Sequence, residues 1–204
     1  MESTIFLQRL RSKTANSHQL IEQNSASQLL ISKGVTIAQY AHYLKSMYGF
    51  VYGFEKIVFP ILKHHPLLQL NDRKKSHFIQ ADLAMLNQTA AQPYVSDVLF
   101  STHYQTASAA LGGMYVLEGS TLGGQIISKH LSTVLGTTVS GKTTYLSAYA
   151  RQTGTMWKSF LQLLCEAGAS NNNEDEIIDS AVNTFSLLNN CLSEYSYKLA
   201  ENEN

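Results

Sequence analysis

Two side chains near the N-terminus have the types and the spacing to hold a metal. His18 falls on the apolar stripe of a predicted helix, and Glu22 follows four residues later. One helical turn separates them, so the Glu22 carboxylate can keep the imidazole Nδ1 protonated while Nε2 faces inward. Metal-ligating histidines usually have such a partner. The alternative is a structural histidine, either buried against a neighbour or exposed at the edge of the stripe, and surface pairs with this spacing are also common.

The remaining histidines indicate which kind of metal His18 would bind. They form no HxxxH or HExxH pattern, and no cluster of cysteines or carboxylates supplies a multi-ligand zinc or di-iron site. A single protein ligand suits a metal that an organic macrocycle already holds, and haem iron is such a metal. Haem is a flat disc, so a second wall is needed. The other histidines are His42, His64, His65, His77, His103 and His130.

Glycines in a long apolar segment are the candidate for that second wall. Gly112, Gly119 and Gly123 recur at spacings of seven and four, which places them on one face of a helix. Each glycine inside a helix costs about 1 kcal/mol relative to alanine, so the bare backbone must serve a purpose. One purpose is the close approach of a flat ligand and a small axial molecule. The other is a tight GxxxG crossing of two helices through Gly119 and Gly123, and spacing alone favours neither.

Helices must position these residues, because the chain has helical periodicity and no convincing strand alternation. Thr36 and Gln39 form a predicted capping box. Helices are expected over residues 3–23, 36–59, 71 or 72 to 88, 96–135 with a break near Tyr104, 146–167 and 174–201, and Pro60, Pro66 and Pro93 lie where helices end or loops begin. The sequence therefore predicts an all-α, single-domain helical bundle over residues 1–204.

Composition argues against several kinds of partner. The 204 residues carry no formal net charge and only 15% charged residues, which disfavours a nucleic-acid surface or a polybasic membrane patch. No apolar run approaches the roughly 20 residues of a membrane span, and the N-terminal residues predict neither a signal peptide nor an anchor. Cys165 and Cys191 lack metal-site spacing, so we expect a reducing, cytoplasmic compartment.

Two segments together resemble a known family. LRSKTANSHQLIE over residues 10–22 and GGMYVLEGSTLGGQ over residues 112–125 are similar to the biliverdin-forming haem oxygenases, most of all to the bacterial branch often found with bacteriophytochromes. The similarity extends along most of the chain and includes NTFSLLNN over residues 183–190. The resemblance implies haem sandwiched between a proximal N-terminal helix and a glycine-rich distal helix.

The resemblance assigns roles on the proximal side. His18 matches the histidine that ligates the haem iron, and Glu22 matches the carboxylate that hydrogen-bonds this histidine. Thr14 and Arg11 lie one and two turns earlier, where the family places a residue lining the haem edge and a basic partner for a propionate.

On the distal side, Gly119, Gly123 and Gly124 match the glycines that lie over the oxygen-binding face, and Phe185 matches an apolar wall of the pocket. The match is looser for further propionate partners, for which the candidates are Tyr115, Arg151 and Lys158.

One position departs from the family pattern. Mammalian and cyanobacterial members carry an aspartate after the first glycine of the distal motif, where it orders a water that delivers a proton; this chain has Ser120. A hydroxyl does not replace a carboxylate, because only the carboxylate accepts strongly without donating. The bacterial branch tolerates small residues here, so water and backbone carbonyls are expected to take over this role.

The implied activity is oxidation of haem, both cofactor and substrate, by O₂ and external electrons to biliverdin, carbon monoxide and ferrous iron. No flavin or dinucleotide motif is present, so a ferredoxin or a flavin reductase would supply electrons, and a bacteriophytochrome is a candidate acceptor of biliverdin. Two alternatives remain at this stage. One is a haem carrier or sensor without turnover, and the other is a thiaminase-like or di-iron relative, which would need a pocket cysteine or paired carboxylates.

Overall fold

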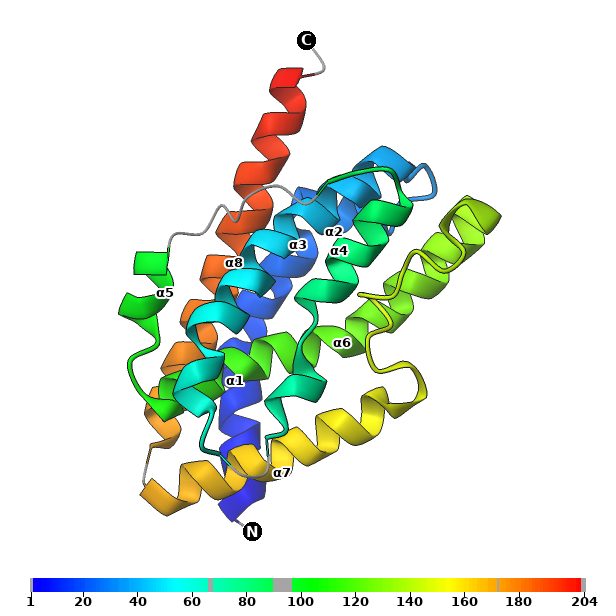
Figure 1. Ribbon diagram of the computed structural model, residues 1–204. Coiled ribbons are helices and arrows are strands. Elements are labelled where there is room, and N and C mark those ends of the chain that lie inside the picture. The colour runs from blue at the N-terminus through cyan, green and yellow to red at the C-terminus, as the bar shows by residue number, and fades with distance from the viewer. Residues whose placement is uncertain (1, 66–67, 90–96, 172, 203–204) are drawn as a thin grey trace.

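The computed structural model describes residues 2–65, 68–89, 97–171 and 173–202. Within these ranges the chain forms α-helices joined by short 3-10 turns and irregular segments (Figure 1). The α-helices are α1 (Glu2–Gln23), α2 (Ser25–Leu30), α3 (Ile37–Ile57), α4 (Ser76–Met85), α5 (Asp97–His103), α6 (Ala107–Leu135), α7 (Thr153–Asn171) and α8 (Glu174–Asn202). The 3-10 turns are η1 (Phe59–Leu62), η2 (Leu70–Arg73), η3 (Gly136–Val139) and η4 (Ala150–Gln152).

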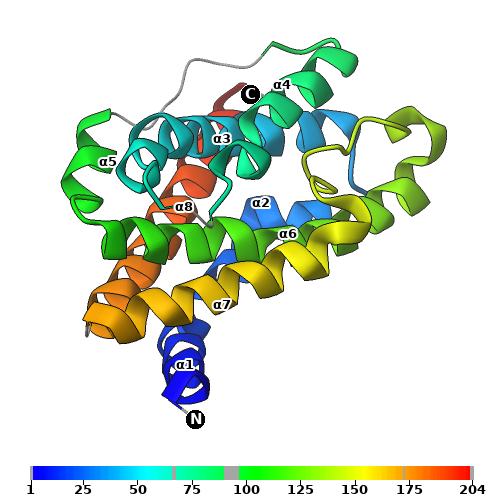
Figure 2. The same ribbon diagram turned by 60° about the horizontal axis from the view of Figure 1, so that its bottom comes forward.

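Helix α6 is the element around which the others are arranged. It packs most extensively against α8 and also contacts α7, which runs alongside it in Figure 2. Helix α1 packs against α8 and α7, and α3 packs against α4 and α8. Because α1 and α6 both rest on α8, the two segments that carry the sequence motifs belong to one packed unit.

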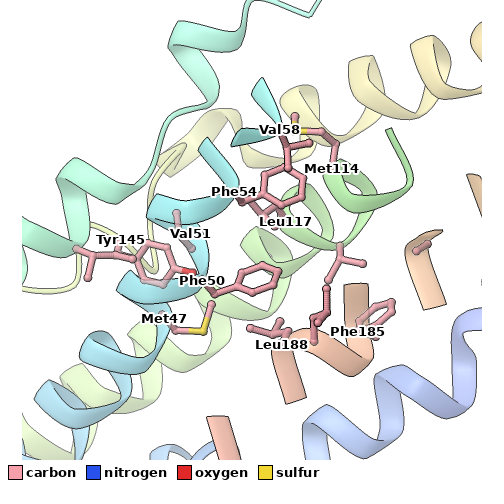
Figure 3. Close-up of a cluster of buried hydrophobic side chains, with 14 of the residues drawn as sticks. Met47, Phe50, Val51, Phe54, Val58, Met114, Leu117, Tyr145, Phe185 and Leu188 are labelled. Carbon is pink, nitrogen blue, oxygen red and sulfur yellow. The ribbon is translucent and has the colours of Figure 1, made fainter. Parts of the chain in front are cut away.

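The hydrophobic core lies where α3, α6 and α8 meet (Figure 3). Helix α3 contributes Phe50 and Phe54, α6 contributes Met114, and α8 contributes Phe185 and Leu188, and all five side chains are buried. Burying one large apolar side chain is worth about 1.5–3 kcal/mol, so this junction fixes α6 relative to α8 and α3.

Most of the predicted helices are confirmed. The first and last helices agree with the expected ranges to within a residue, and Thr36 and Gln39 form the predicted capping box at the start of α3. The long segment before residue 136 breaks near Tyr104 as expected, where the Thr106 hydroxyl accepts from Ala109 N and caps α6. Pro60 lies in η1 after the end of α3, whereas Pro66 and Pro93 lie outside the described residues.

Two predicted helices begin later than expected, and α2 was not predicted. Helix α4 starts at Ser76, where the Glu55 carboxylate accepts from the backbone N–H of Ser76. Helix α7 starts at Thr153 rather than near residue 146, because the buried Asp82 holds the preceding segment as turns by accepting from the backbone N–H groups of Thr144 and Tyr145. These carboxylates bond to backbone groups that are far away in the sequence. Helical periodicity therefore could not predict where the two helices begin.

No helix within the described ranges is both long enough and apolar enough to cross a membrane.

Candidate active site

A cavity of about 580 Å³ lies between α1, α2 and α6, with further walls from α3, α7, α8 and the segment before α7. This volume is within the usual range for sites that bind small molecules and cofactors. The cavity mouth is apolar, since Ile31, Leu122 and Ile126 line it and are 49%, 40% and 71% exposed. In the described part of the chain, no group of three or more His, Cys, Asp or Glu side chains could hold a metal ion.

The proximal wall of the cavity is formed by His18 and Glu22 of α1 together with Phe185 of α8. His18 Nδ1 lies 3.6 Å from Glu22 Oε1, slightly beyond hydrogen-bond length. The edge of the His18 ring contacts Phe185, with the ring centroids 5.8 Å apart and the planes at 82°. The His18 side chain is 60% exposed, so this histidine is not held in the core. Glu22 faces Nδ1, which leaves Nε2 for a ligand.

The distal wall of the cavity is formed by Gly119, Ser120 and Gly123 of α6. A Cβ atom built on Gly123 would meet nothing within 4 Å. One built on Gly119 would meet only the ring edge of Trp157, at 3.5 and 3.8 Å. These two glycines therefore leave open space beside the backbone. In the part of the chain that the structure describes, no second helix packs tightly against them, so the hypothesis of a GxxxG crossing through Gly119 and Gly123 is wrong.

The other glycines of α6 serve close packing. A Cβ on Gly112 would lie 2.4 Å from the Ile177 carbonyl oxygen of α8, and one on Gly113 would lie 2.6 Å from the Phe54 ring. Gly124 also lines the cavity, but a Cβ there would lie 2.5 Å from the carbonyl oxygen of Leu146. Gly112 thus does not share the open face of Gly119 and Gly123, although its spacing suggested that it would.

Ser120 lines the cavity, yet its hydroxyl is already used. The Oγ donates to the Leu117 carbonyl, one turn earlier in the same helix, at 2.8 Å. A hydroxyl has one proton to donate, so Ser120 faces the cavity as an acceptor in this conformation.

A polar corner lies where α1 meets α6. Tyr115 lines the cavity, and burial raises the pKa of its phenol, while a hydrogen bond with Thr14 and the charge of Arg11 lower it. Thr14 is buried and donates to the Leu10 carbonyl at 2.8 Å. Arg11 is exposed on α1. Tyr115 lines the cavity, whereas Thr14 and Arg11 lie next to it without lining the cavity, so Tyr115 and the nearby Arg11 charge are the groups that suit a carboxylate of a bound molecule.

Two of the predicted anion partners lie elsewhere. Arg151 in η4 and Lys158 in α7 are both exposed, and neither lines the cavity. The start of α7 at Thr153 explains the position of Arg151, because turns replace the helix that was expected to include it, whereas Lys158 lies on the expected helix but on its exposed face.

Sequence reasoning missed several residues at the site. Trp157 lines the cavity, and its ring lies 5.5 Å from that of Tyr115. It directly precedes Lys158, and a lone tryptophan next to a candidate position is a signal that could have been used. Tyr43, Met47 and Tyr145 also line the cavity but come from segments with no motif.

Glu118 was missed as a buried charge beneath the distal wall. It is fully buried and accepts from Lys75 Nζ at 2.7 Å, from the Tyr149 hydroxyl at 2.9 Å, and from Arg73. Burial lowers the pKa of Lys75, and the Glu118 charge opposes that shift. A single glutamate within an apolar helix was the available signal. The cluster ties the segment before α4 to α6 next to Gly119.

Comparison with known proteins decides the family. The model of the Heme oxygenase family matches residues 4–194. The chain belongs to the haem oxygenase family. Haem oxygenases with solved structures share its fold. The enzyme from Neisseria meningitidis, solved with NO and CO bound, is 23% identical over 93% of this chain and 91% of its own, with a TM-score of 0.70.

Two further haem oxygenases have the same fold. Haem oxygenase-1 of the cyanobacterium Synechocystis, solved in complex with haem, is 18% identical over 96% of this chain and 94% of its own, with a TM-score of 0.76. The haem oxygenase of Leptospira interrogans is 18% identical over 95% of this chain and its entire own length, with a TM-score of 0.75. A comparison with curated proteins gave no match.

Proposed function

We propose that this protein binds one haem in the cavity and oxidises it to biliverdin, carbon monoxide and ferrous iron. The observation that carries this proposal is that one cavity places a histidine with a carboxylate partner opposite helix backbone without side chains, at Gly119 and Gly123. A flat macrocycle with one protein ligand fits between these walls, and membership of the haem oxygenase family supports it.

His18 would bind the iron through Nε2. Glu22 Oε1 lies 3.6 Å from Nδ1, and a small side-chain rotation would let it accept from Nδ1–H, which would leave Nε2 unprotonated and keep the ligand basic. Phe185 limits rotation of the ring from the other side. Glu22 and Phe185 would therefore orient the His18 ring from two sides.

The polar corner of Arg11, Thr14 and Tyr115 would hold haem propionates. The rest of the cavity is lined mainly by apolar side chains and suits the macrocycle. A charge at one edge and apolar walls elsewhere would give the bound molecule a single orientation in its plane.

Haem held by His18 would supply the chemistry, which is the activation of O₂ by its reduced iron. The distal backbone at Gly119 and Gly123 leaves room for a small molecule beside the iron. Ser120 accepts rather than donates, so it would hold a water molecule that carries the proton.

Electrons would come from a ferredoxin or a flavin reductase, since the chain has no flavin or dinucleotide motif. The low cysteine content and the lack of metal-site spacing between Cys165 and Cys191 support a reducing cytoplasm as the location. A bacteriophytochrome that takes up biliverdin is the candidate acceptor of the product.

A haem carrier or sensor is the second candidate. Ser120 stands where other members carry the aspartate, and its hydroxyl already donates to the Leu117 carbonyl. Such a protein would bind haem and O₂ without degrading the macrocycle.

Conversion of hemin separates these functions. The purified protein is mixed with hemin, and a ferredoxin system or ascorbate is added with catalase present. The proposal predicts a sharp Soret band, followed by biliverdin and carbon monoxide. A Soret band that persists without biliverdin would support the carrier, and no Soret band would contradict both.

His18→Ala tests the iron ligand in the same assay. The variant should lose the axial bond and biliverdin formation while keeping part of the hydrophobic binding of hemin. His77→Ala is the matched control, because His77 is exposed on α4 and does not line the cavity. An unchanged spectrum and unchanged affinity in His18→Ala would remove His18 from the proposal.

A further inference from the structure

A hydrogen bond joins the two sides of the cavity mouth. On one side the mouth is lined by Leu122 and Ile126 of α6, and on the other by Ile31, directly after α2. His130 follows one turn later in α6, and its Nε2 lies 2.9 Å from the carbonyl oxygen of Ser32. A carbonyl oxygen can only accept, so Nε2 carries a proton and donates it. The turn after α2 is thereby attached to α6 beside the mouth.

The segment that His130 attaches is weakly packed. Helix α2 is six residues long, too short to be stable without support, and Leu30 is its buried residue. In the turn that follows, Ile31, Lys33 and Gly34 are exposed before the chain is buried again at Val35. A Cβ on Gly34 would meet nothing within 4 Å. Segments with few buried apolar contacts open at low cost, so this turn is suited to local opening.

The start of α2 is held more firmly than its end. The buried Asn24 caps the helix by accepting from Ala26 N at 3.0 Å. Its Nδ2 donates to Asn189 Oδ1 at 3.0 Å and to Ser193 Oγ at 2.8 Å, both on α8. Helix α2 also packs against α1, α3 and α8. Opening would therefore move the end of α2 and the following turn away from α6, while the start of α2 stays in place.

We propose that His130 is a positioning residue that keeps the cavity mouth narrow, and that breaking its bond to Ser32 opens the route by which haem enters and leaves. This inference rests on the proposed function, in which the cavity takes haem. His130 does not line the cavity, so it acts through the turn after α2 and not on the bound molecule. Loss of one hydrogen bond of average strength raises the open population about fivefold.

The first test needs no haem. Hydrogen exchange is measured in the haem-free protein at the amides of Ser32 and Val35, which donate to the carbonyls of Leu29 and Ser32. In His130→Ala these amides should exchange about fivefold faster, while amides in the middle of α3 do not change. His130→Gln retains a side-chain N–H donor and should restore part of the protection. Exchange within twofold of the unaltered protein in His130→Ala would overturn the proposal.

The second test measures how fast hemin binds, by stopped flow, and how fast it leaves, by transfer to excess apomyoglobin. Haem passes the same opening in both directions, so His130→Ala should raise both rates about fivefold and leave the Kd within twofold. A purely structural loss would instead raise the Kd without faster binding. His103→Ala is the matched control, because His103 Nδ1 lies 3.0 Å from a backbone carbonyl oxygen, that of Leu99, but within α5 and away from the cavity.

A variant with the opposite expected effect covers the case in which His130→Ala does not fold. Gly34→Ala adds a methyl group to open space and restricts the turn, so it should slow hemin binding and release by about threefold. Unchanged rates in both His130→Ala and Gly34→Ala, or in Gly34→Ala when His130→Ala does not fold, would reject the role of the turn and leave the proposed function intact. A protein that binds no hemin would reject the proposed function, and hydrogen exchange would still test the His130 contact.

Discussion

Two regions of α6, one near its N-terminus and one at its middle, use glycine for opposite purposes. At Gly112 and Gly113 the missing Cβ lets α8 and Phe54 approach the backbone, and a side chain would overlap them. At Gly119 and Gly123 the missing Cβ leaves room at the cavity. Glycine lowers helix stability in both regions. Close packing offsets this cost at Gly112 and Gly113, whereas at Gly119 and Gly123 the purpose of glycine is space for a ligand. Spacing along the helix does not distinguish these uses, because it reports the face and not what lies opposite.

The largest effect on stability is expected at the closely packed glycines, Gly112 and Gly113. Gly112→Ala places a Cβ 2.4 Å from the Ile177 carbonyl oxygen, so α6 and α8 must separate. We expect a loss of about 3 kcal/mol of unfolding free energy, at the upper end of overpacking costs, measured by denaturant unfolding. Gly119→Ala is the control, since its Cβ would make only ordinary contact with Trp157. Equal stability of the two variants would show that the packed and open glycines do not differ.

The second effect is on hemin binding and concerns the open glycines, Gly119 and Gly123, where a substitution should leave the fold unchanged. Gly123→Leu fills space beside the distal backbone and should weaken hemin binding by about 100-fold, or about 2.7 kcal/mol, while thermal unfolding shifts little or upward. Gly154→Leu is the matched control, because Gly154 is also helical and open but does not line the cavity. Unfolding of Gly123→Leu under conditions where Gly154→Leu is stable would favour packing as the role of Gly123.

The third effect is smaller and concerns Ser120, next to Gly119. Its hydroxyl donates to Leu117, so Ser120→Ala should keep most of the rate of biliverdin formation, with a water taking the place of the Oγ. A direct donor to bound oxygen would instead cost about 100-fold or more. Ser120→Asp restores the carboxylate of other family members and could divert the reaction to an inactive state. Initial rates of biliverdin formation distinguish these outcomes.

The smallest effect is a gain in stability. Gly123→Ala adds one methyl group to open space and improves helix propensity by up to about 1 kcal/mol, so the midpoint of thermal unfolding should rise by a few degrees. Hemin binding should change by less than about tenfold. A lower midpoint would mean that a neighbour contacts Gly123 after all.

The sequence carried enough information for most of the helices and for the pairing of His18 with Glu22. Local signals fixed them, since the capping box of Thr36 and Gln39 starts α3 and the spacing of four places Glu22 beside His18. The break near Tyr104 was also predicted, and in the structure Thr106 caps α6 directly after it. Each of these features depends on residues within a few positions of one another.

Features that depend on distant residues were not predictable from local patterns. Asp82 delays the start of α7 through bonds to the backbone some 60 residues later, and this moves Arg151 off the predicted helix. Glu118 accepts from Lys75 and Arg73, which lie more than 40 residues earlier in the chain, and no local spacing predicts this contact. Tyr43 and Tyr145 line one cavity only after α3 and the segment before α7 have packed against α6.

The crystal structure of the complex with hemin tests the central claim most directly. The account predicts iron bound to His18 Nε2, with Glu22 on the Nδ1 side, and the opposite face of the macrocycle against the backbone at Gly119 and Gly123. The propionates should lie toward Arg11, Thr14 and Tyr115. Hemin bound outside this cavity, or ligated by a residue other than His18, would contradict it.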